Sequence, residues 1–271
     1  MALADILDKI IADKTAEVSY RKSQMSLEQL RERVRLMRRC RNFYKAVTKR
    51  STRGINVIAE VKKASPSSGL IRENFDPVAI AQTYQECGAD AISVLTDEKY
   101  FQGRLEYIEQ IKQTVDLPVL RKDFIIDPWQ VYESRAAGAD AILLIAEALV
   151  PGRLMDLMIV AAELTLTVLL EVHHADILLA VRSLIGFPEK GYSVLGINNR
   201  DLKTMQVDLG TSCRLADLLD NKDDLVAESG IKTRADVEKL KSVGVKAVLV
   251  GQVLCESADI EEKFTELFGG E

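Results

Sequence analysis

Short, nearly continuous runs of apolar residues recur along the chain and begin 23 to 36 residues apart. Runs that are apolar at almost every position indicate strands buried on both faces, as in a parallel sheet. Eight segments fit this description: residues 55–63, 91–97, 118–124, 141–147, 167–173, 193–200, 224–230 and 247–253.

Helical spacing of apolar residues fills the intervals between these runs. The clearest examples are residues 77–88, 105–115, 129–138, 175–186 and 234–244.

The joint between helix and strand is itself repeated, as CGADAISVLTD (87–97), AGADAILLIAE (137–147) and, weakened, VGVKAVLVGQV (243–253). Eight such units over about 200 residues predict an α/β protein with a closed (β/α)8 TIM barrel. A doubly wound open sheet is the alternative. It usually has fewer strands and a glycine-rich first turn, and the chain contains no G-x-G-x-x-G motif.

Residues 1–53 precede the first strand and predict helices, one of which begins with the capping-box pattern SLEQ at 26–29. We expect these residues to form an extension packed on a single barrel domain, residues 54–271. They carry 14 Lys and Arg against 6 Asp and Glu, a net +8, whereas the rest carries 22 against 35, a net −13.

A basic extension on an acidic body is compatible with nucleic-acid binding or with an extension that lies back on the body. The second is favoured, because only Phe43 and Tyr44 place aromatic rings close together there. We therefore expect no nucleic-acid partner. We expect instead that the extension covers part of the barrel mouth and contributes to closure over a substrate.

The composition is ordinary for a globular protein, with 47% apolar and 28% charged residues. No apolar run approaches the roughly 20 residues of a membrane span, and the N-terminus lacks a signal-peptide pattern. The four cysteines form no C-x-x-C pair, and the chain has two histidines. These counts argue against a metal site and a disulfide framework, and predict a reduced, cytoplasmic protein without a membrane partner.

Charged residues interrupt the C-terminal ends of the predicted strands, where barrel enzymes carry their catalytic groups. In VLRKDFII (119–126), alternation turns Lys122 toward the barrel interior and Arg121 and Asp123 toward the helices. Structural ion pairs are the alternative for any one such residue. The set as a whole predicts a site: Glu60, Lys62, Lys122, Glu171, Asn198, Arg200, Glu228 and Ser229.

Glycines at 230 and 251 end the last two strands, at the place where barrels bind phosphate through backbone N–H groups. Lys62, Lys122 and Arg200 would supply positive potential for an anionic substrate. His173 and His174 fit acid–base groups or a strand-to-helix turn with one exposed ring, and the turn is favoured.

Six motifs in order resemble the indole-3-glycerol-phosphate synthase family. They are IAEVKKASPSSG (58–69), ISVLTDEKYFQG (92–103), LRKDFI (120–125), LLEVH (169–173), GINNRDL (196–202) and ESGI (228–231). The resemblance covers roughly residues 1–265 and implies a barrel enzyme of tryptophan biosynthesis. That enzyme would close an indole ring on an anionic sugar phosphate with loss of carbon dioxide and water, and without metal or cofactor. We expect a monomer and leave open its association with other pathway enzymes.

The resemblance implies catalytic roles for several of these residues. Lys122 is the expected general acid at the substrate ketone, and Lys62 with Glu171 serves the dehydration, with acid and base not divided between them. Glu60 is expected to hold the lysines and the substrate hydroxyls in place.

The family pattern also implies Asn198 and Ser229 as further catalytic residues, together with binding positions. Asn198 would orient the substrate, Arg200 would bind its carboxylate, and Glu228 and Ser229 would complete the polar wall. The expected phosphate positions are Ser65, Gly230, Gly251 and Gln252, and the expected walls of the aromatic half are Pro66, Phe101, Phe124 and Leu249.

Two positions depart from the family pattern. Gln252 follows the eighth-strand glycine, where a small or acidic residue is usual, and Ala64 replaces a lysine of some relatives. We expect both to alter affinity more than chemistry. A different reaction, a Schiff-base aldolase using Lys122 or Lys62, is the enzymatic alternative.

Overall fold

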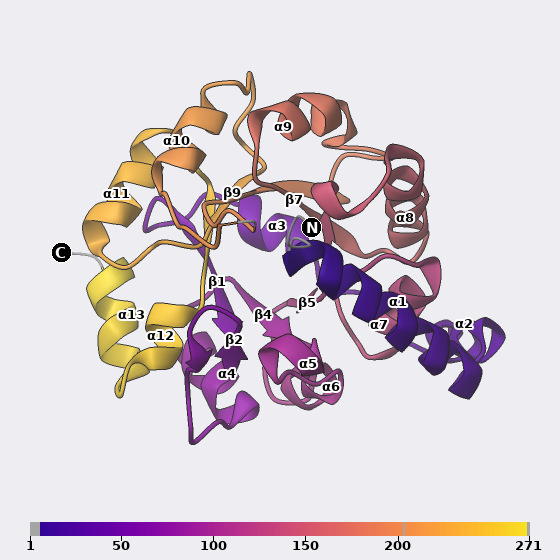
Figure 1. Cartoon of the computed structure of the whole chain (residues 1–271). Helices are drawn as coiled ribbons and strands as arrows, with labels where there is room; N and C mark the ends of the chain where they lie inside the picture. The colour runs from indigo at the N-terminus through magenta and orange to yellow at the C-terminus, as the bar shows by residue number, and fades with distance from the viewer. Residues whose placement is uncertain (1–5, 203, 270–271) are drawn as a thin grey trace.

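The computed structural model describes residues 6–202 and 204–269, and within them eight parallel strands close into a barrel (Figure 1). Residues 1–5 of the predicted extension and residues 270–271 of the predicted barrel domain lie outside this description. The strands follow in barrel order as β1 (Asn56–Val61), β4 (Ala91–Leu95), β5 (Val119–Lys122), β6 (Ala141–Ile145), β7 (Thr167–Val172), β8 (Ser193–Asn198), β9 (Leu225–Glu228) and β10 (Ala247–Val250). The predicted (β/α)8 barrel is confirmed.

Each barrel strand lies inside its predicted segment, and all eight end earlier than the segment does. The segment 193–200 stops being a strand at Asn198, and Arg200 makes an isolated antiparallel bridge with Val207. The chain leaves the sheet early because the polar residues at these ends face the barrel mouth, where loops begin. A small hairpin of β2 (Ala64–Ser65) and β3 (Gly69–Leu70) was not predicted.

Helices surround the barrel, and several begin at a carboxylate or hydroxyl cap, such as Asp76, Asp127 and Thr233. The larger ones are α4 (Pro77–Glu86), α6 (Glu106–Lys112), α7 (Pro128–Ala136), α8 (Pro151–Glu163), α9 (Ala175–Val181), α10 (Gly210–Ala216), α11 (Arg234–Ser242) and α13 (Ile260–Phe268). The shorter ones are α5 (Glu98–Phe101), α12 (Gln252–Glu256), η1 (Ala146–Ala148) and η2 (Arg182–Leu184). In the described part of the chain, no helix combines the length and apolarity that a membrane crossing requires.

Alternation along the strands divides the core in two. Ile58, Leu120 and Leu169 belong to a cluster inside the barrel, whereas Val57 and Val168 belong to the cluster between strands and helices. Because one-residue steps separate the clusters, each strand needs apolar residues on both faces. The continuous apolar runs of the sequence have this cause.

The N-terminal helices are α1 (Ile6–Gln24), α2 (Leu27–Arg35) and α3 (Phe43–Thr48). The capping box predicted for α2 is present at Ser26 and Gln29. Helix α3 packs Phe43 and Val47 into the cluster inside the barrel, beside the start of β1. Helix α1 lies over the opposite end, in front of the strands in Figure 1.

The mouth is therefore covered by α1, which belongs to residues 1–53 as expected, whereas the strongly basic segment 31–53 packs elsewhere on the barrel. Ile6, Leu7 and Ile10 of α1 line the cavity there. In the basic segment, Arg41 donates hydrogen bonds to backbone carbonyls of residues 112, 115 and 117, and Arg53 pairs with Asp90 at 2.8 Å. These contacts support an extension that lies back on the body. The division into an extension, residues 1–53, and a single barrel domain, residues 54–271, stays a prediction.

Candidate functional site

A cavity of about 750 Å³ occupies the C-terminal mouth of the barrel. Every residue that the sequence suggested for the site contributes to its lining. These residues come from the ends of several strands and from the loops that follow them, as the barrel architecture requires. Their shared location is thus observed, while their individual roles stay predictions.

Lys122, at the end of β5, holds the centre of the polar wall. Its Nζ lies 3.0 Å from Oε2 of Glu171 and 3.2 Å from Oε2 of Glu228. Burial by itself would lower the pKa of the lysine, but Glu171, Glu228 and Glu60 outweigh burial and raise it. Lys122 is therefore a protonated donor, and Glu171 with Glu228 contacts it directly.

The pKa values of the two carboxyl groups around Lys122 are shifted in opposite directions. Burial disfavours the charge of both, yet Lys122 and His173 lower the pKa of Glu171. The pKa of Glu228 is raised by burial, which outweighs Lys122, and the charge of Glu171 raises it further. Two carboxyl groups with pKa values driven apart are the arrangement of an acid and a base.

Room for Glu228 inside the barrel comes from Gly196 on the neighbouring strand β8. A Cβ at Gly196 would overlap Oε1 of Glu228 and approach Leu169. The sequence shows the signal only in retrospect, because Gly196 lies two positions before Asn198 and shares its inward face.

Glu60 pairs with its own strand neighbour. Its Oε1 accepts from Nζ of Lys62 at 2.6 Å, so Glu60 is the direct partner of Lys62 and not of Lys122. A Cβ at Gly251 would lie 2.5 Å from the same carboxylate oxygen. Gly251 thus has a packing role beside Glu60, in addition to its expected position at the phosphate.

His173 and His174 lie at a strand-to-helix turn and differ in burial, and His174 is the one that fits the turn interpretation. His174 is half-buried and is the N-cap of α9, whereas His173 is buried. The His173 ring places Nε2 3.3 Å from Oε1 of Glu171 and Nδ1 3.1 Å from Oε2 of Glu147. Burial alone would lower the pKa of His173, but the two carboxylates raise it to about 10.

The aromatic wall joins two loops. Phe101 ends α5, Phe124 follows β5, and their ring centroids lie 6.2 Å apart. Pro66 and Leu249 line the same cavity. The wall therefore stands beside Lys122, with which Phe124 shares a strand end.

The loop after β9 holds two residues in left-handed backbone, Ser229 at φ 64° and Gly230 at φ 81°. A non-glycine residue there carries strain, which is typical of functional sites. Across the cavity, Gln252 donates to Oγ of Ser68 at 3.0 Å and to Glu256 at 2.7 Å, and Oγ of Ser65 accepts from the N–H of Ser68. The unusual Gln252 therefore fastens the loop of Ser65.

Asn198 and Arg200 share the mouth at the end of β8. Oδ1 of Asn198 accepts from the backbone N–H of Arg200 at 3.0 Å, and the half-buried guanidinium donates to the carbonyl of Met205 at 3.3 Å. Burial lowers the pKa of Arg200, although the guanidinium keeps its charge.

The family model described as indole-3-glycerol phosphate synthase matches residues 7–267. The chain belongs to the indole-3-glycerol phosphate synthase family. Members of this family are decarboxylating carbon–carbon lyases of tryptophan biosynthesis, and they bind a phosphorylated small molecule.

Curated relatives with that name agree along nearly the whole chain. The protein of Polynucleobacter asymbioticus is 44% identical, covering 98% of this chain and 100% of its own. That of Rhodopirellula baltica is 44% identical, covering 94% and 95%. That of Geobacillus thermodenitrificans is 50% identical, covering 84% and 87%.

Solved structures with low identity share the barrel. A 3-hexulose-6-phosphate synthase superposes with a TM-score of 0.61 at 15% identity, covering 79% of this chain and 98% of its own. A thiamine phosphate pyrophosphorylase from Pyrococcus furiosus gives 0.56 at 16% identity, covering 80% and 96%. At this identity the likeness concerns the fold alone.

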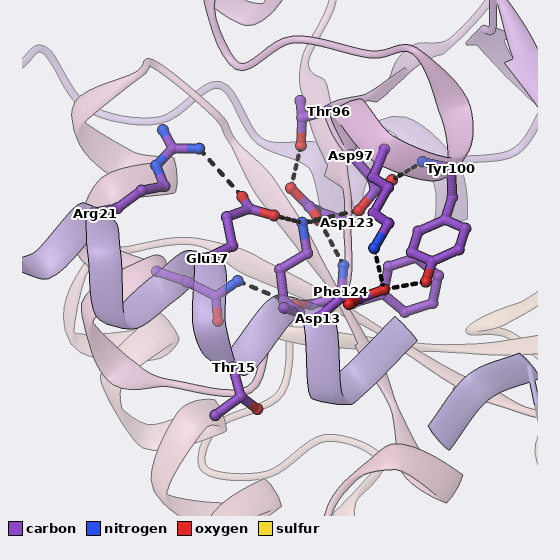
Figure 2. A network of polar contacts seen from close by, with 12 residues as sticks. Asp13, Thr15, Glu17, Arg21, Thr96, Asp97, Tyr100, Asp123 and Phe124 are labelled. Carbon is purple, nitrogen blue, oxygen red and sulfur yellow. Dashed lines mark hydrogen bonds and ion pairs between the residues drawn. The ribbon is translucent and has the colours of Figure 1, made fainter. Parts of the chain in front are cut away.

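Within the synthase family fold, a second polar layer lies behind Lys122. Arg121 and Asp123 face the helices and pair at 2.9 Å, as alternation predicted. Lys14 of α1 reaches the same layer, with Nζ 3.0 Å from Asp123 (Figure 2). Sequence reasoning missed Lys14, because its contacts depend on where α1 lies.

Proposed function

We propose that this protein converts 1-(2-carboxyphenylamino)-1-deoxyribulose 5-phosphate to indole-3-glycerol phosphate, with Lys122 as the general acid. The observation that carries the assignment is the position of Lys122 in the cavity, in contact with both Glu171 and Glu228. A lysine held protonated by buried carboxylates is suited to give a proton to a ketone oxygen.

The first step forms the carbon–carbon bond of the new ring. The ring carbon that bears the carboxylate attacks the ketone carbon, and Lys122 gives a proton to the ketone oxygen, which becomes a hydroxyl. A positioned acid of this kind contributes about 10²–10⁴ in rate. Loss of carbon dioxide then returns the bonding electrons to the ring and restores its aromaticity.

The second step removes the hydroxyl as water. One group gives a proton to the leaving oxygen, and another accepts the proton of the ring nitrogen as its electrons form a carbon–nitrogen π bond. A proton then passes from the neighbouring methylene carbon to the nitrogen, which completes the indole. Lys62 and Glu171 lie on the cavity wall on two sides of Lys122 and are assigned to this pair. Glu60 keeps Lys62 in place through their 2.6 Å contact.

The substrate lies across the mouth in one orientation. Arg200, with its planar fork of donors, takes the substrate carboxylate until it leaves as carbon dioxide. The phosphate lies at the backbone of Gly230 and Gly251, near Ser65, and Asn198 fixes the chain between the two ends. Each step is a proton transfer or a bond rearrangement, for which side chains suffice, and we assign no cofactor.

The Schiff-base alternative meets an obstacle at Lys122. An amine that attacks a carbonyl must be neutral, and enzymes reach this state by lowering the lysine pKa. The carboxylates around Lys122 raise its pKa instead. This favours proton donation by Lys122 over covalent catalysis.

The test is turnover by Lys122→Met, followed by the fluorescence of the indole product. We expect kcat to fall by about 10²–10⁴, and the wild type to stay active in the presence of a chelator. The matched control is Lys246→Met, since Lys246 precedes β10 at the opposite end of the barrel and pairs with Asp223 at 3.4 Å. Unchanged turnover by Lys122→Met would remove the assigned acid.

We further propose a cytoplasmic monomer. The thiols of Cys40, Cys87, Cys213 and Cys255 are free, which suits a reducing compartment. Helix α1 of the same chain supplies the remaining wall of the cavity, so that a second copy is not required. Sedimentation velocity checks the monomer, and a dimer at assay concentration would contradict it.

A further inference from the structure

Lys14 lies in the middle of α1 with its side chain 2% exposed. Its Nζ is 2.7 Å from Oε2 of Glu17, 2.9 Å from Oδ2 of Asp97 and 3.0 Å from Oδ1 of Asp123. The carboxylates of Glu17, Asp97 and Asp123, which Figure 2 labels, therefore converge on this nitrogen. An apolar residue could pack a helix at lower cost than a buried ion, so the charge calls for a reason.

Asp97 and Asp123 each fix the backbone of a segment that bears a cavity aromatic. Asp97 is the N-cap of α5, and its Oδ1 accepts from the N–H of Tyr100 at 2.7 Å. This helix ends in Phe101. Oδ1 of Asp123 accepts from the N–H of Phe124 at 2.8 Å. One ammonium group therefore ties the two segments whose rings form the aromatic wall.

Helix α1 itself is the third part of that wall. Ile10, one turn before Lys14, lines the cavity together with Ile6. Asp13 of the same helix contacts α5 through Tyr100 and through Lys99 at 2.7 Å. The position of α1 along its axis is thus linked to the position of Phe101.

The ammonium stays charged across the range in which enzymes work. Burial would lower the pKa of Lys14, but Asp123 and Asp97 outweigh burial and raise it. The pKa of Asp123 is lowered, because Arg121 and Lys14 outweigh its burial. The tie between helix and loops is therefore an ion pair at neutral pH.

We propose that Lys14 is a positioning residue that holds α1, Phe101 and Phe124 in one arrangement and thereby determines affinity for the aromatic half of the substrate. The inference rests on the proposed function, in which this wall receives the carboxyphenylamino ring. It gives the N-terminal helix a specific task in binding, beyond covering the mouth.

Loss of the Lys14 ammonium should affect Asp97 more than Asp123. Asp123 keeps Arg121 at 2.9 Å and Thr96 at 2.6 Å. Asp97 keeps its cap hydrogen bond from the N–H of Tyr100 but loses the Lys14 cation, and a buried carboxylate without a cation turns toward water. Helix α5 and Phe101 then shift relative to Phe124.

The experiment compares Lys14→Met with Lys22→Met in the full chain. Lys22 lies two turns further along the same helix and forms an exposed pair with Asp127 at 2.7 Å, which makes it a matched control. We expect Lys14→Met to raise KM about tenfold or more while kcat changes less than about threefold, the pattern of lost uniform binding. Lys22→Met should change neither by more than about twofold.

Inorganic phosphate separates a local effect from a general one. As a competitive inhibitor it reports the phosphate end of the cavity, and its inhibition constant should stay within about twofold in Lys14→Met. The emission of Trp129, the single tryptophan, reports seating of the extension, since its Nε1 donates to the carbonyl of Met25 at 2.9 Å.

A folded Lys14→Met with wild-type KM would overturn the proposal, and so would an equal loss of phosphate affinity. If the single variant does not fold, Lys14→Met with Asp97→Asn removes the ion together with its partner charge and keeps a cap acceptor. The same rise in KM is expected, and a wild-type KM there would equally overturn it. A wild type without turnover would instead count against the proposed function.

Discussion

Strand β5 separates two polar networks that are built from neighbouring residues. On the helix side, Arg121 donates to Asp123 at 2.9 Å, to Glu133 at 2.8 Å and to Thr96 and Ser134 at 3.1 Å each. On the cavity side, Lys122 donates to Glu171 at 3.0 Å, and its contact with Glu228 at 3.2 Å is an ion pair without an aligned hydrogen bond.

Burial does not distinguish these networks, because both are buried, but the completeness of pairing does. On the helix side each charge stabilises its partner, so that the pKa of Arg121 rises and that of Asp123 falls despite the burial of both. On the cavity side Glu171 and Glu228 compete for one lysine, and their pKa values move in opposite directions. Incomplete pairing leaves a proton that can move, which is what acid–base catalysis needs.

Among the variants that test this difference between the networks, Arg121→Met should have the largest effect, and we expect that effect on stability. Removing one partner of a buried pair leaves Asp123 and Glu133 with less compensation, and typically costs about 3–5 kcal/mol. We expect the free energy of unfolding to fall by this amount in urea denaturation, while kcat of the folded enzyme changes little.

Arg35→Met is the control for that variant, since Arg35 pairs with Glu32 at 2.9 Å on the exposed face of α2. It should lie within about 0.5 kcal/mol of the wild type. If Arg121→Met kept full stability and lost turnover, the two networks would have the reverse roles.

The barrel and the orientation of β5 were accessible from sequence for a simple reason. Apolar runs, their spacing and the two-residue period are local properties, and they place Lys122 inside and Arg121 with Asp123 outside. The same period placed Glu60 with Lys62. What stays local in the chain could be predicted.

Contacts across the fold could not be predicted in this way. Gly196 matters because register brings β9 beside β8, so that Glu228 needs its space. Lys14 matters because α1 crosses the mouth, and the net charge of residues 1–53 does not show which part of the extension lies there. Strand ends were placed too late because the polar residues that follow each apolar run face the cavity from loops, and the sequence does not show where strand gives way to loop.

Gly196→Ala breaks the cavity-side network without removing any of its charges. Its methyl group would overlap Oε1 of Glu228, and displacing the carboxylate costs about 1–3 kcal/mol as overpacking. We expect kcat to fall about tenfold as Glu228 moves from Lys122.

The control is Gly152→Ala in α8, where a Cβ meets nothing within 4 Å among the described atoms. Exchange of a helical glycine for alanine should leave kcat unchanged and stabilise by about 0.5–1 kcal/mol. Equal turnover in Gly196→Ala and Gly152→Ala would show that the exact place of Glu228 is immaterial.

Within a single pH unit, the smallest effect concerns the imidazole ring of His173, which adds a cation to the cavity side between Glu147 and Glu171. Its folded pKa of about 10 exceeds the ordinary value of 6.5. The resulting stabilisation is complete below pH 6.5, declines as pH rises, and is lost above about pH 10. Wild-type stability should therefore decrease relative to His173→Gln by up to about 1.4 kcal/mol per pH unit in that window.

Because the chain has two histidines, ¹⁵N NMR shows the protonation state of His173 directly. His173→Gln assigns the signals, and His174→Gln is the control for the half-buried ring. We expect the His173 ring to keep both protons at pH 8. A ring that loses a proton near pH 6.5 would mean that the carboxylates of Glu147 and Glu171 do not hold it charged. The cavity side would then rely on its lysines alone to keep Glu171 ionised.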